Sequence, residues 1–316
     1  MLNYAIRRTT SVAPAIAGVV TLVFLMLRMI PGDPAAYIGG EGMSAEALEG
    51  LRERLGLNEP LLLQYVHYVT DLFRFDLGHS IHTNLPITTV IANAMPVTAI
   101  VAILAIIVGT LISVPLGAVA AYAKYRGNDA ADSGLTVFAM VIDTLPSFWV
   151  SLLLMLFLSL QLGWFPISGP IDWGDPIYMA KRLALPVIVL GTAQIASVAR
   201  VTRTSVLQTL EEDYIRTARS LGASERSILF RHALPNAALP IITITGLSVG
   251  RLFSGTVITE SIFSLPGMGT QLINSIYSRD YPVVQGLILS YAVIFVVVNV
   301  VTDLVYTRVD PRVRLS

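Results

Sequence analysis

Long apolar runs limit what this chain can fold into more than any other feature. Of its 316 residues, 54% are hydrophobic and only 13% are charged, whereas a soluble domain carries about a quarter charged residues. A bilayer span needs about 20 apolar residues. The runs that reach or approach this length cover residues 12–29, 97–121, 135–160, 184–201, 237–257 and 283–305. We therefore expect an all-α integral membrane protein with six transmembrane helices.

The distribution of lysine and arginine gives the expected orientation. Cytoplasmic loops of membrane proteins are enriched in these residues, and placing both termini inside the cell leaves the larger share of them there. Arg7 and Arg8 before the first run resemble the start of a secretory signal. The run is longer than a signal core, and no clear cleavage site follows it directly. We expect a retained first helix, with the N-terminus and the C-terminus both in the cytoplasm.

The fourth run is the most polar of the six because Gln194, Ser197 and Arg200 interrupt it. Polar residues inside a span usually face other helices or a water-filled cavity rather than lipid. We therefore expect this helix to pack within the bundle.

Residues 31–96 form the longest segment outside the spans and are expected to be a structured periplasmic segment. Ser44 suits the N-cap of a short helix that Gly56 would end. A second amphipathic helix is expected between Leu62 and Phe73. The segment could cap the spans or receive an extracytoplasmic partner. The expected organisation is a tail and first helix at 1–30, this segment at 31–96, and a core region at 97–316 that contains the second to sixth spans and a cytoplasmic loop at 206–235.

A polar, basic insert at residues 213–235 separates two of the spans on the expected cytoplasmic side. One apolar face recurs at helical spacing through Leu210, Tyr214, Ala218 and Leu221. Gly222 suits the left-handed position after a helix. The pattern predicts a short helix, a glycine turn and a second helix that Pro235 ends. Without further information, the insert could equally rest on anionic lipid headgroups.

The second half of the insert has its own helix signals. Ser224 can cap the second helix, and Glu225 would lie in its first turn, where an acidic side chain suits the helix dipole.

Charged residues inside the expected spans are candidates for a translocation path or gate. Asp143 precedes Pro146 in the third span, and Arg251 lies in the fifth. Asp143 could line the path or stabilise a helix broken at the proline, or it could bond to a neighbouring helix. Glu260, just after the fifth span, is a further candidate for the path or gate.

Several kinds of active site are excluded by the residues themselves. A phosphate-binding loop needs Gly-Lys-Ser/Thr, but both lysines, Lys124 and Lys181, follow alanine. His79 and His82 are too few for a metal site, and the sequence contains no cysteine. We expect no enzyme, no bound cofactor or metal, and no nucleic-acid partner.

The insert resembles the EAA loop of permeases from ATP-binding cassette (ABC) importers, with the pattern EAA-x3-G-x9-I-x-LP. Aligned on Gly222, the closing Leu-Pro falls on Leu234 and Pro235. Arg216 replaces the first Glu and His232 replaces the Ile, as in the peptide-transport branch of the family. Further stretches resemble dipeptide and oligopeptide permeases: GDPA at 32–35, FDLGHS at 75–80, ESIFSLPGMG at 260–269 and RDYPVVQG at 279–286.

The resemblance implies a type I ABC importer permease fold in the bacterial inner membrane. The insert would be a coupling helix that fits a groove on a cytoplasmic ATPase. The residues implied in this coupling are Asp213, Tyr214, Arg216, Ala218, Arg219, Leu221, Gly222 and Pro235.

The same resemblance implies the partners. They are a second, homologous permease, two ATPases that use Mg-ATP, an extracytoplasmic binding protein and membrane lipid. The cargo would be di- or oligopeptides.

Three alternatives remain open from the sequence. The same family also carries nickel or glutathione. An ion-driven secondary transporter would show inverted repeats and midplane carboxylates, and a membrane-anchored scaffold would not transport at all. We find no convincing repeat, and the polar fourth helix argues against a scaffold.

Overall fold

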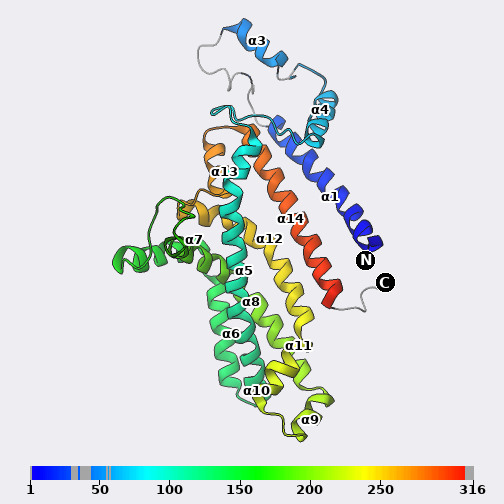
Figure 1. Ribbon diagram of the computed structural model, residues 1–316, viewed down its shortest axis with the longest axis vertical. Coiled ribbons are helices and arrows are strands. Elements are labelled where there is room, and N and C mark those ends of the chain that lie inside the picture. The colour runs from blue at the N-terminus through cyan, green and yellow to red at the C-terminus, as the bar shows by residue number, and fades with distance from the viewer. Residues whose placement is uncertain (1, 30–34, 36–43, 55, 57, 310–316) are drawn as a thin grey trace. The chain divides into compact units, whose positions relative to one another are not determined.

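The computed structural model describes residues 2–29, 35, 44–54, 56 and 58–309. These residues are almost entirely helical, and the β pairing found among them is an isolated antiparallel bridge between His79 and Pro86. The chain divides into two compact units (Figure 1). Unit 1 comprises Met1–Pro96 with Thr270–Val296, and unit 2 comprises Val97–Gly269 with Val297–Ser316.

Unit 1 contains helices from both ends of the chain. They are α1 (Leu2–Met29), α3 (Ala45–Arg54), α4 (Leu61–Phe73), the beginning of α5 (Ile87–Tyr125), most of α13 (Met268–Tyr277) and much of α14 (Tyr281–Val309). The Phe24 ring of α1 lies 5.1 Å from the Tyr65 ring of α4 and 5.6 Å from the Tyr68 ring. Aromatic packing therefore joins α1 to α4.

The 31–96 segment, which is expected to be periplasmic, contains the two helices that the sequence predicts. The backbone N–H of Ala47 donates to Ser44 Oγ at 3.2 Å, so Ser44 is an N-cap. Gly56 adopts φ +64°, the left-handed conformation in which glycine avoids a steric cost. Parts of this segment, including residues 30–34 and 36–43, lie outside the described residues.

Unit 2 is built around α8 (Pro176–Leu210), which packs against α5, α6 (Asp129–Thr144) and α12 (Ala238–Ile262). One hydrophobic cluster joins α5, α8 and α12 through buried residues that include Val101, Leu190 and Leu252. Short helices fill the connections: α7 (Ser147–Leu154), η1 (Met155–Gln161), α9 (Asp213–Ser220), α10 (Glu225–Ser227), η2 (Ile228–Ala233) and α11 (Leu234–Asn236).

Several described helices could cross a bilayer. Three are long and apolar enough on their own, and up to five spans result if each of two bent helix pairs counts as one. A shorter apolar stretch of α1, Ala13–Met26, corresponds to the first expected span. The helical fold class is therefore confirmed, whereas the six-span count and the orientation remain predictions.

The third expected span is not a single straight helix. Within 135–160 the chain leaves α6 at Thr144 and enters α7 at Ser147, and the two parts are bent by 93°. Leu145 is extended, with φ −71° and ψ 127°. A residue before proline is driven out of the α region by the proline ring, so Pro146 accounts for the break.

The fourth expected span packs within the bundle, as its polar residues predict. Gln194 is buried, and its Nε2 donates to the carbonyl oxygens of Ala105 at 3.4 Å and Ile106 at 3.0 Å in α5. The helix is longer than expected, because α8 continues on both sides of 184–201. Its first turns include Arg182, which precedes the expected span.

Candidate functional site

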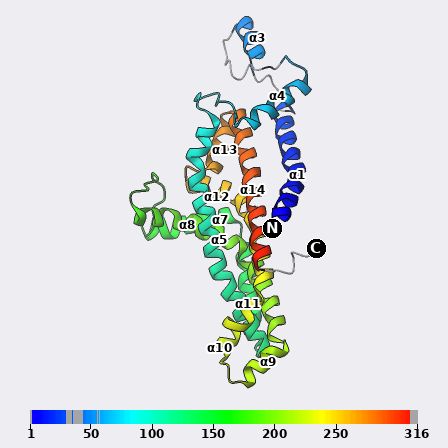
Figure 2. The same ribbon diagram turned by 45° about the vertical axis from the view of Figure 1, so that its right-hand side comes forward.

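The 213–235 insert begins with a short helix that a buried side chain packs against the rest of unit 2. That helix is α9, and its Ile215 side chain is 0% exposed. Ile215 belongs to a cluster with Val206 and Leu210 of α8, Ala121 of α5 and Ile228 of η2. Figures 1 and 2 both place α9 and α10 together at one end of this unit. Movement of α9 is therefore coupled to α8 and α5.

The predicted apolar face of the insert is mostly exposed. Leu210 is buried, but Leu221 is 83% exposed and Tyr214 is 42% exposed. Ala218 is half-buried. The sequence therefore located the helix, but it did not identify Ile215 as the side chain that makes the buried contact. The face through Tyr214 and Leu221 remains available to another surface.

The turn after α9 has the predicted geometry. Gly222 adopts φ +83°, and a Cβ added there would meet nothing within 4 Å. Glycine is therefore needed for the backbone conformation and not for contacts inside this chain. Ser224 caps the next helix, since its Oγ accepts from Ser227 N at 3.3 Å.

Arg219 holds the two helices of the insert together. Its Nε donates to Glu225 Oε1 at 3.1 Å and its Nη2 to Glu225 Oε2 at 3.2 Å. Its Nη1 donates to the Tyr125 hydroxyl of α5 at 2.8 Å. The bond to Glu225, followed by the bond to Tyr125, raises the pKa of Arg219. The guanidinium therefore stays charged and ties α9 to both α10 and α5.

The end of the insert lies close to the predicted position. The helical segment 225–236 contains Pro235 near its end and meets α12 after Asn236, with a bend of 61°. Asn236 Nδ2 donates to the Tyr214 hydroxyl at 3.0 Å and to the His232 carbonyl at 2.7 Å. Partial burial raises the pKa of the Tyr214 hydroxyl.

The remaining polar residues of α9 face solvent. Asp213 Oδ1 accepts from Arg216 Nη1 at 3.2 Å, and both side chains are exposed. An exposed pair of this kind contributes little to stability, so these charges are available to an external partner.

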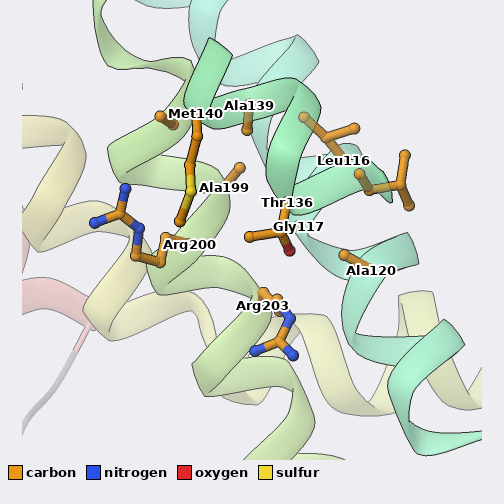
Figure 3. Close-up of a pocket in the computed structure, with 11 residues that line it drawn as sticks. Leu116, Gly117, Ala120, Thr136, Ala139, Met140, Ala199, Arg200 and Arg203 are labelled. Carbon is orange, nitrogen blue, oxygen red and sulfur yellow. The ribbon is translucent and has the colours of Figure 1, made fainter. Parts of the chain in front are cut away.

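A buried ion pair lies close to the insert. Arg203 of α8 donates through Nε and Nη2 to the two carboxylate oxygens of Asp132 in α6. The Arg203 side chain also lines a cavity of about 50 Å³ between α5, α6 and α8. Figure 3 shows Arg203 and Arg200 on α8, with Gly117 and Thr136 on the neighbouring helices. The pair therefore joins α6 to the helix that leads into α9.

The candidate path residues are not gathered into one site by the described contacts. Asp143 and Pro146 are both exposed at the break between α6 and α7. Arg251 lies in α12, but its side chain is outside the described part of the structure. No metal-binding group of three or more His, Cys, Asp or Glu occurs among the described side chains.

Glu260 is fully buried in the last turns of α12, which extends past the expected end of the fifth span. Its Oε2 accepts from the backbone N–H of Gly269 at 2.7 Å. A Cβ at Gly267 would collide with this carboxylate, so the glycines of SLPGMG make room for it. The geometry gives Glu260 a role in shaping the 263–269 turn.

Arg182 supports the same turn and was not singled out from the sequence. It is 1% exposed, and its Nη2 donates to the carbonyl oxygens of Phe263 at 2.7 Å and Ser264 at 3.1 Å. Arg182 follows Lys181 just before the expected fourth span, where charged residues usually belong to a loop outside the membrane. The sequence therefore held no signal for this contact, because Arg182 is separated from Phe263 by 81 positions and from Ser264 by 82.

Comparison with known protein families shows to which family the chain belongs. The family described as the inner membrane component of binding-protein-dependent transport systems matches residues 113–315. The chain belongs to this family. A second family, the N-terminal part of such membrane components, matches residues 1–102. This binding-protein-dependent transport component is thus a multi-pass inner membrane protein and a permease subunit rather than an ATPase.

Full-length relatives of this transport component carry the names of peptide permeases. A Brucella abortus (strain 2308) protein named as a peptide transport system permease is 40% identical over 99% of both chains. The dipeptide transport system permease DppB of Alkalihalophilus pseudofirmus is 38% identical over 99% of this chain and 100% of its own. DppB of Escherichia coli (strain K12) is 36% identical over 99% of both.

A solved structure supports the fold. The crystal structure of an amino acid ABC transporter with histidines aligns with a TM-score of 0.50 at 19% identity. The alignment covers 70% of this chain and 94% of that chain. At this identity the match shows a shared ABC transporter permease fold and nothing about cargo.

Proposed function

We propose that this chain is a permease subunit of an ABC importer that translocates di- or oligopeptides. The observation that carries the transport mechanism is α9, a short helix anchored through Ile215 and Arg219 whose Tyr214–Leu221 face is exposed. An anchored helix with an unpartnered face can receive movement from another protein and pass it to α8 and α5. The names of full-length relatives support peptides as the cargo.

The partners follow from the same proposal. The exposed face of α9 docks on a cytoplasmic ATPase, with both termini of the chain in the cytoplasm. Two such ATPases hydrolyse Mg-ATP, and a second, homologous permease supplies the other half of the path. An extracytoplasmic binding protein delivers the peptide, as the family description indicates for its members.

The break between α6 and α7 is the proposed gate. Asp143 and Pro146 lie on the two sides of this break, and both are exposed in this chain by itself. An exposed carboxylate inside an otherwise apolar span is costly in lipid, so we place Asp143 against the path between the two permeases. Arg251 and Glu260 are proposed to act on the path less directly, Glu260 by holding the 263–269 turn.

The experiment that tests this function uses the complete complex in proteoliposomes. Uptake of a labelled dipeptide and ATP hydrolysis are both measured with the purified cognate binding protein present. Peptide uptake that requires both ATP and the binding protein is the expected result. Uptake of nickel or glutathione in place of peptides would contradict the cargo, and uptake driven by an ion gradient without ATP would contradict the mechanism.

Asp143→Ala tests the path within the same assay. Peptide uptake should fall while the complex assembles normally. Undiminished uptake would remove Asp143 from the path.

A further inference from the structure

Two sequence motifs that the proposed function leaves without a role meet in unit 1. One is at 75–80 before α5, and the other is at 279–286 where α14 begins. Ser80 Oγ donates to Asp280 Oδ2, and the Ile81 backbone N–H donates to Asp280 Oδ1 at 3.2 Å. Beside them, His82 Nε2 lies 2.6 Å from the Ser278 carbonyl oxygen. One carboxylate therefore fastens a loop to a turn 200 residues away.

This contact is buried on both sides. Asp280 is 4% exposed and Ser80 is 3% exposed. A buried carboxylate is stable only when hydrogen bonds replace the water it has lost, and bonds to a charged group are stronger than bonds between neutral groups. Ser80 and Ile81 both supply such bonds, so the position of the 75–86 loop is fixed by Asp280.

The backbone around the contact is held in an unfavourable conformation. Among the described residues, four other than glycine have positive φ: Phe75 at 59°, Asn84 at 55°, Ser264 at 49° and Arg279 at 58°. Three of these four, Phe75, Asn84 and Arg279, lie in the 75–86 loop or the 277–280 turn, which are the two fastened segments. Such residues persist only where the surrounding structure determines them, and they concentrate at sites that hold a ligand or partner.

The fastened segments present large aromatic side chains to the outside. Phe75 and Tyr277 are each 85% exposed. Exposed aromatic residues on a rigid backbone are typical of the residues that dominate protein–protein binding. The proposed orientation puts both segments on the extracytoplasmic side, and the family takes its cargo from a binding protein.

We infer that the Ser80–Asp280 contact is a positioning device that holds the 75–86 loop and the 277–280 turn as a docking surface for the extracytoplasmic binding protein. This inference rests on the proposed function. Phe75 touches the binding protein directly, whereas Asp280 and Ser80 act through the loop that they hold.

Titration of the binding protein tests the inference. Complexes are reconstituted in vesicles of phosphatidylethanolamine and phosphatidylglycerol, and ATP hydrolysis is followed as the purified cognate binding protein is added. For Ser80→Ala, Asp280→Asn and Phe75→Ser we expect the half-saturating concentration to rise about tenfold with little change in the maximal rate, the sign of lost binding alone. Ser290→Ala is the matched control, because Ser290 lies in α14 outside the loop and the turn, and its Oγ donates to the Gly286 carbonyl one helical turn earlier at 2.7 Å.

The outcomes separate the two proposals. A wild-type complex that the binding protein never stimulates would contradict the proposed function, and this inference with it. A stimulated wild type with unchanged half-saturation in Ser80→Ala and Phe75→Ser would overturn only the inference, because neither the contact nor the Phe75 ring would then affect docking of the binding protein. Loss of assembly in Ser80→Ala with normal titration of Phe75→Ser would also overturn it, because the contact would then serve folding alone.

Discussion

Asp132 of α6 and Arg203 of α8 are joined by two hydrogen bonds between one carboxylate and one guanidinium. The Asp132 side chain is 8% exposed, so removing its partner would leave a largely buried charge. Breaking such a pair costs about 3–5 kcal/mol. We expect Arg203→Ala, which leaves the Asp132 carboxylate unpaired, to lower the thermal unfolding midpoint of the purified complex, and the exchange Asp132→Arg with Arg203→Asp to lower it less.

The Lys124–Asp129 pair is the control for this prediction. Its atoms are 2.7 Å apart, but both side chains are exposed, and exposed pairs contribute about 0–1 kcal/mol. Lys124→Ala should therefore leave the unfolding midpoint nearly unchanged. Equal effects of Lys124→Ala and Arg203→Ala on the unfolding midpoint would show that burial of the partner carboxylate does not matter here.

Substitutions of Ile215 and Leu221 should distinguish the anchoring of α9 within this chain from its docking on the ATPase. Ile215→Ala removes the buried side chain that attaches α9 to its cluster, and truncations of this kind cost about 2–5 kcal/mol. We expect reduced thermal stability, together with ATP hydrolysis that no longer drives uptake. Leu221→Asp changes an exposed side chain, so stability should hold while the ATPase is lost on co-purification. Reduced stability in Leu221→Asp, together with normal co-purification of the ATPase, would contradict the proposed docking face.

Two substitutions of Gly222 distinguish the need for a left-handed backbone from the need for free space beside the turn. Asparagine tolerates the left-handed conformation better than other residues with a side chain, and a Cβ has free space at this position. We expect Gly222→Asn to retain most peptide uptake. Gly222→Trp should abolish both uptake and ATPase association, because the indole would occupy the space that the ATPase needs. Normal coupling in Gly222→Trp would exclude contact at this turn.

Pro146 should be required for the bend between α6 and α7. Pro146→Ala removes the constraint on Leu145, so the two helices can approach one continuous helix and uptake should fall. The chain contains no cysteine, so spin labels on Val141→Cys and Leu152→Cys report one distance, which should lengthen in Pro146→Ala. An unchanged distance would assign the 93° bend to packing rather than to proline.

Local sequence signals identified most helices but not how they pack. Ser44 and Ser224 cap helices as predicted, and Gly222 has the predicted positive φ. These features depend on neighbouring residues, which the sequence shows directly. The family and its fold could also be recognised, because four motifs occur in the expected order.

Contacts between distant segments could not be found in the same way. Asp132 and Arg203 are 71 residues apart, and nothing local distinguishes them from surface charges. Ile215 was missed because Tyr214 and Leu221 fit a helical period equally well, and only the position of α8 decides which side is buried. The end of the helix that contains Pro235 could be predicted to within one residue, because a proline is a local signal, whereas the 61° bend that follows depends on the position of α12.

The glycines between α5 and α8 restrict how unit 2 can change shape. A Cβ at Gly117 would strike the Ala199 carbonyl, one at Gly191 would lie 3.3 Å from the Ala105 carbonyl, and the Gln194 side chain occupies the space beside Gly109. Two backbones interlocked at these levels cannot slide past each other without repacking. Shear between α5 and α8 would therefore require repacking, so we expect any change of shape within unit 2 to occur at the bends at Leu145–Pro146 and Asn236–Ala237.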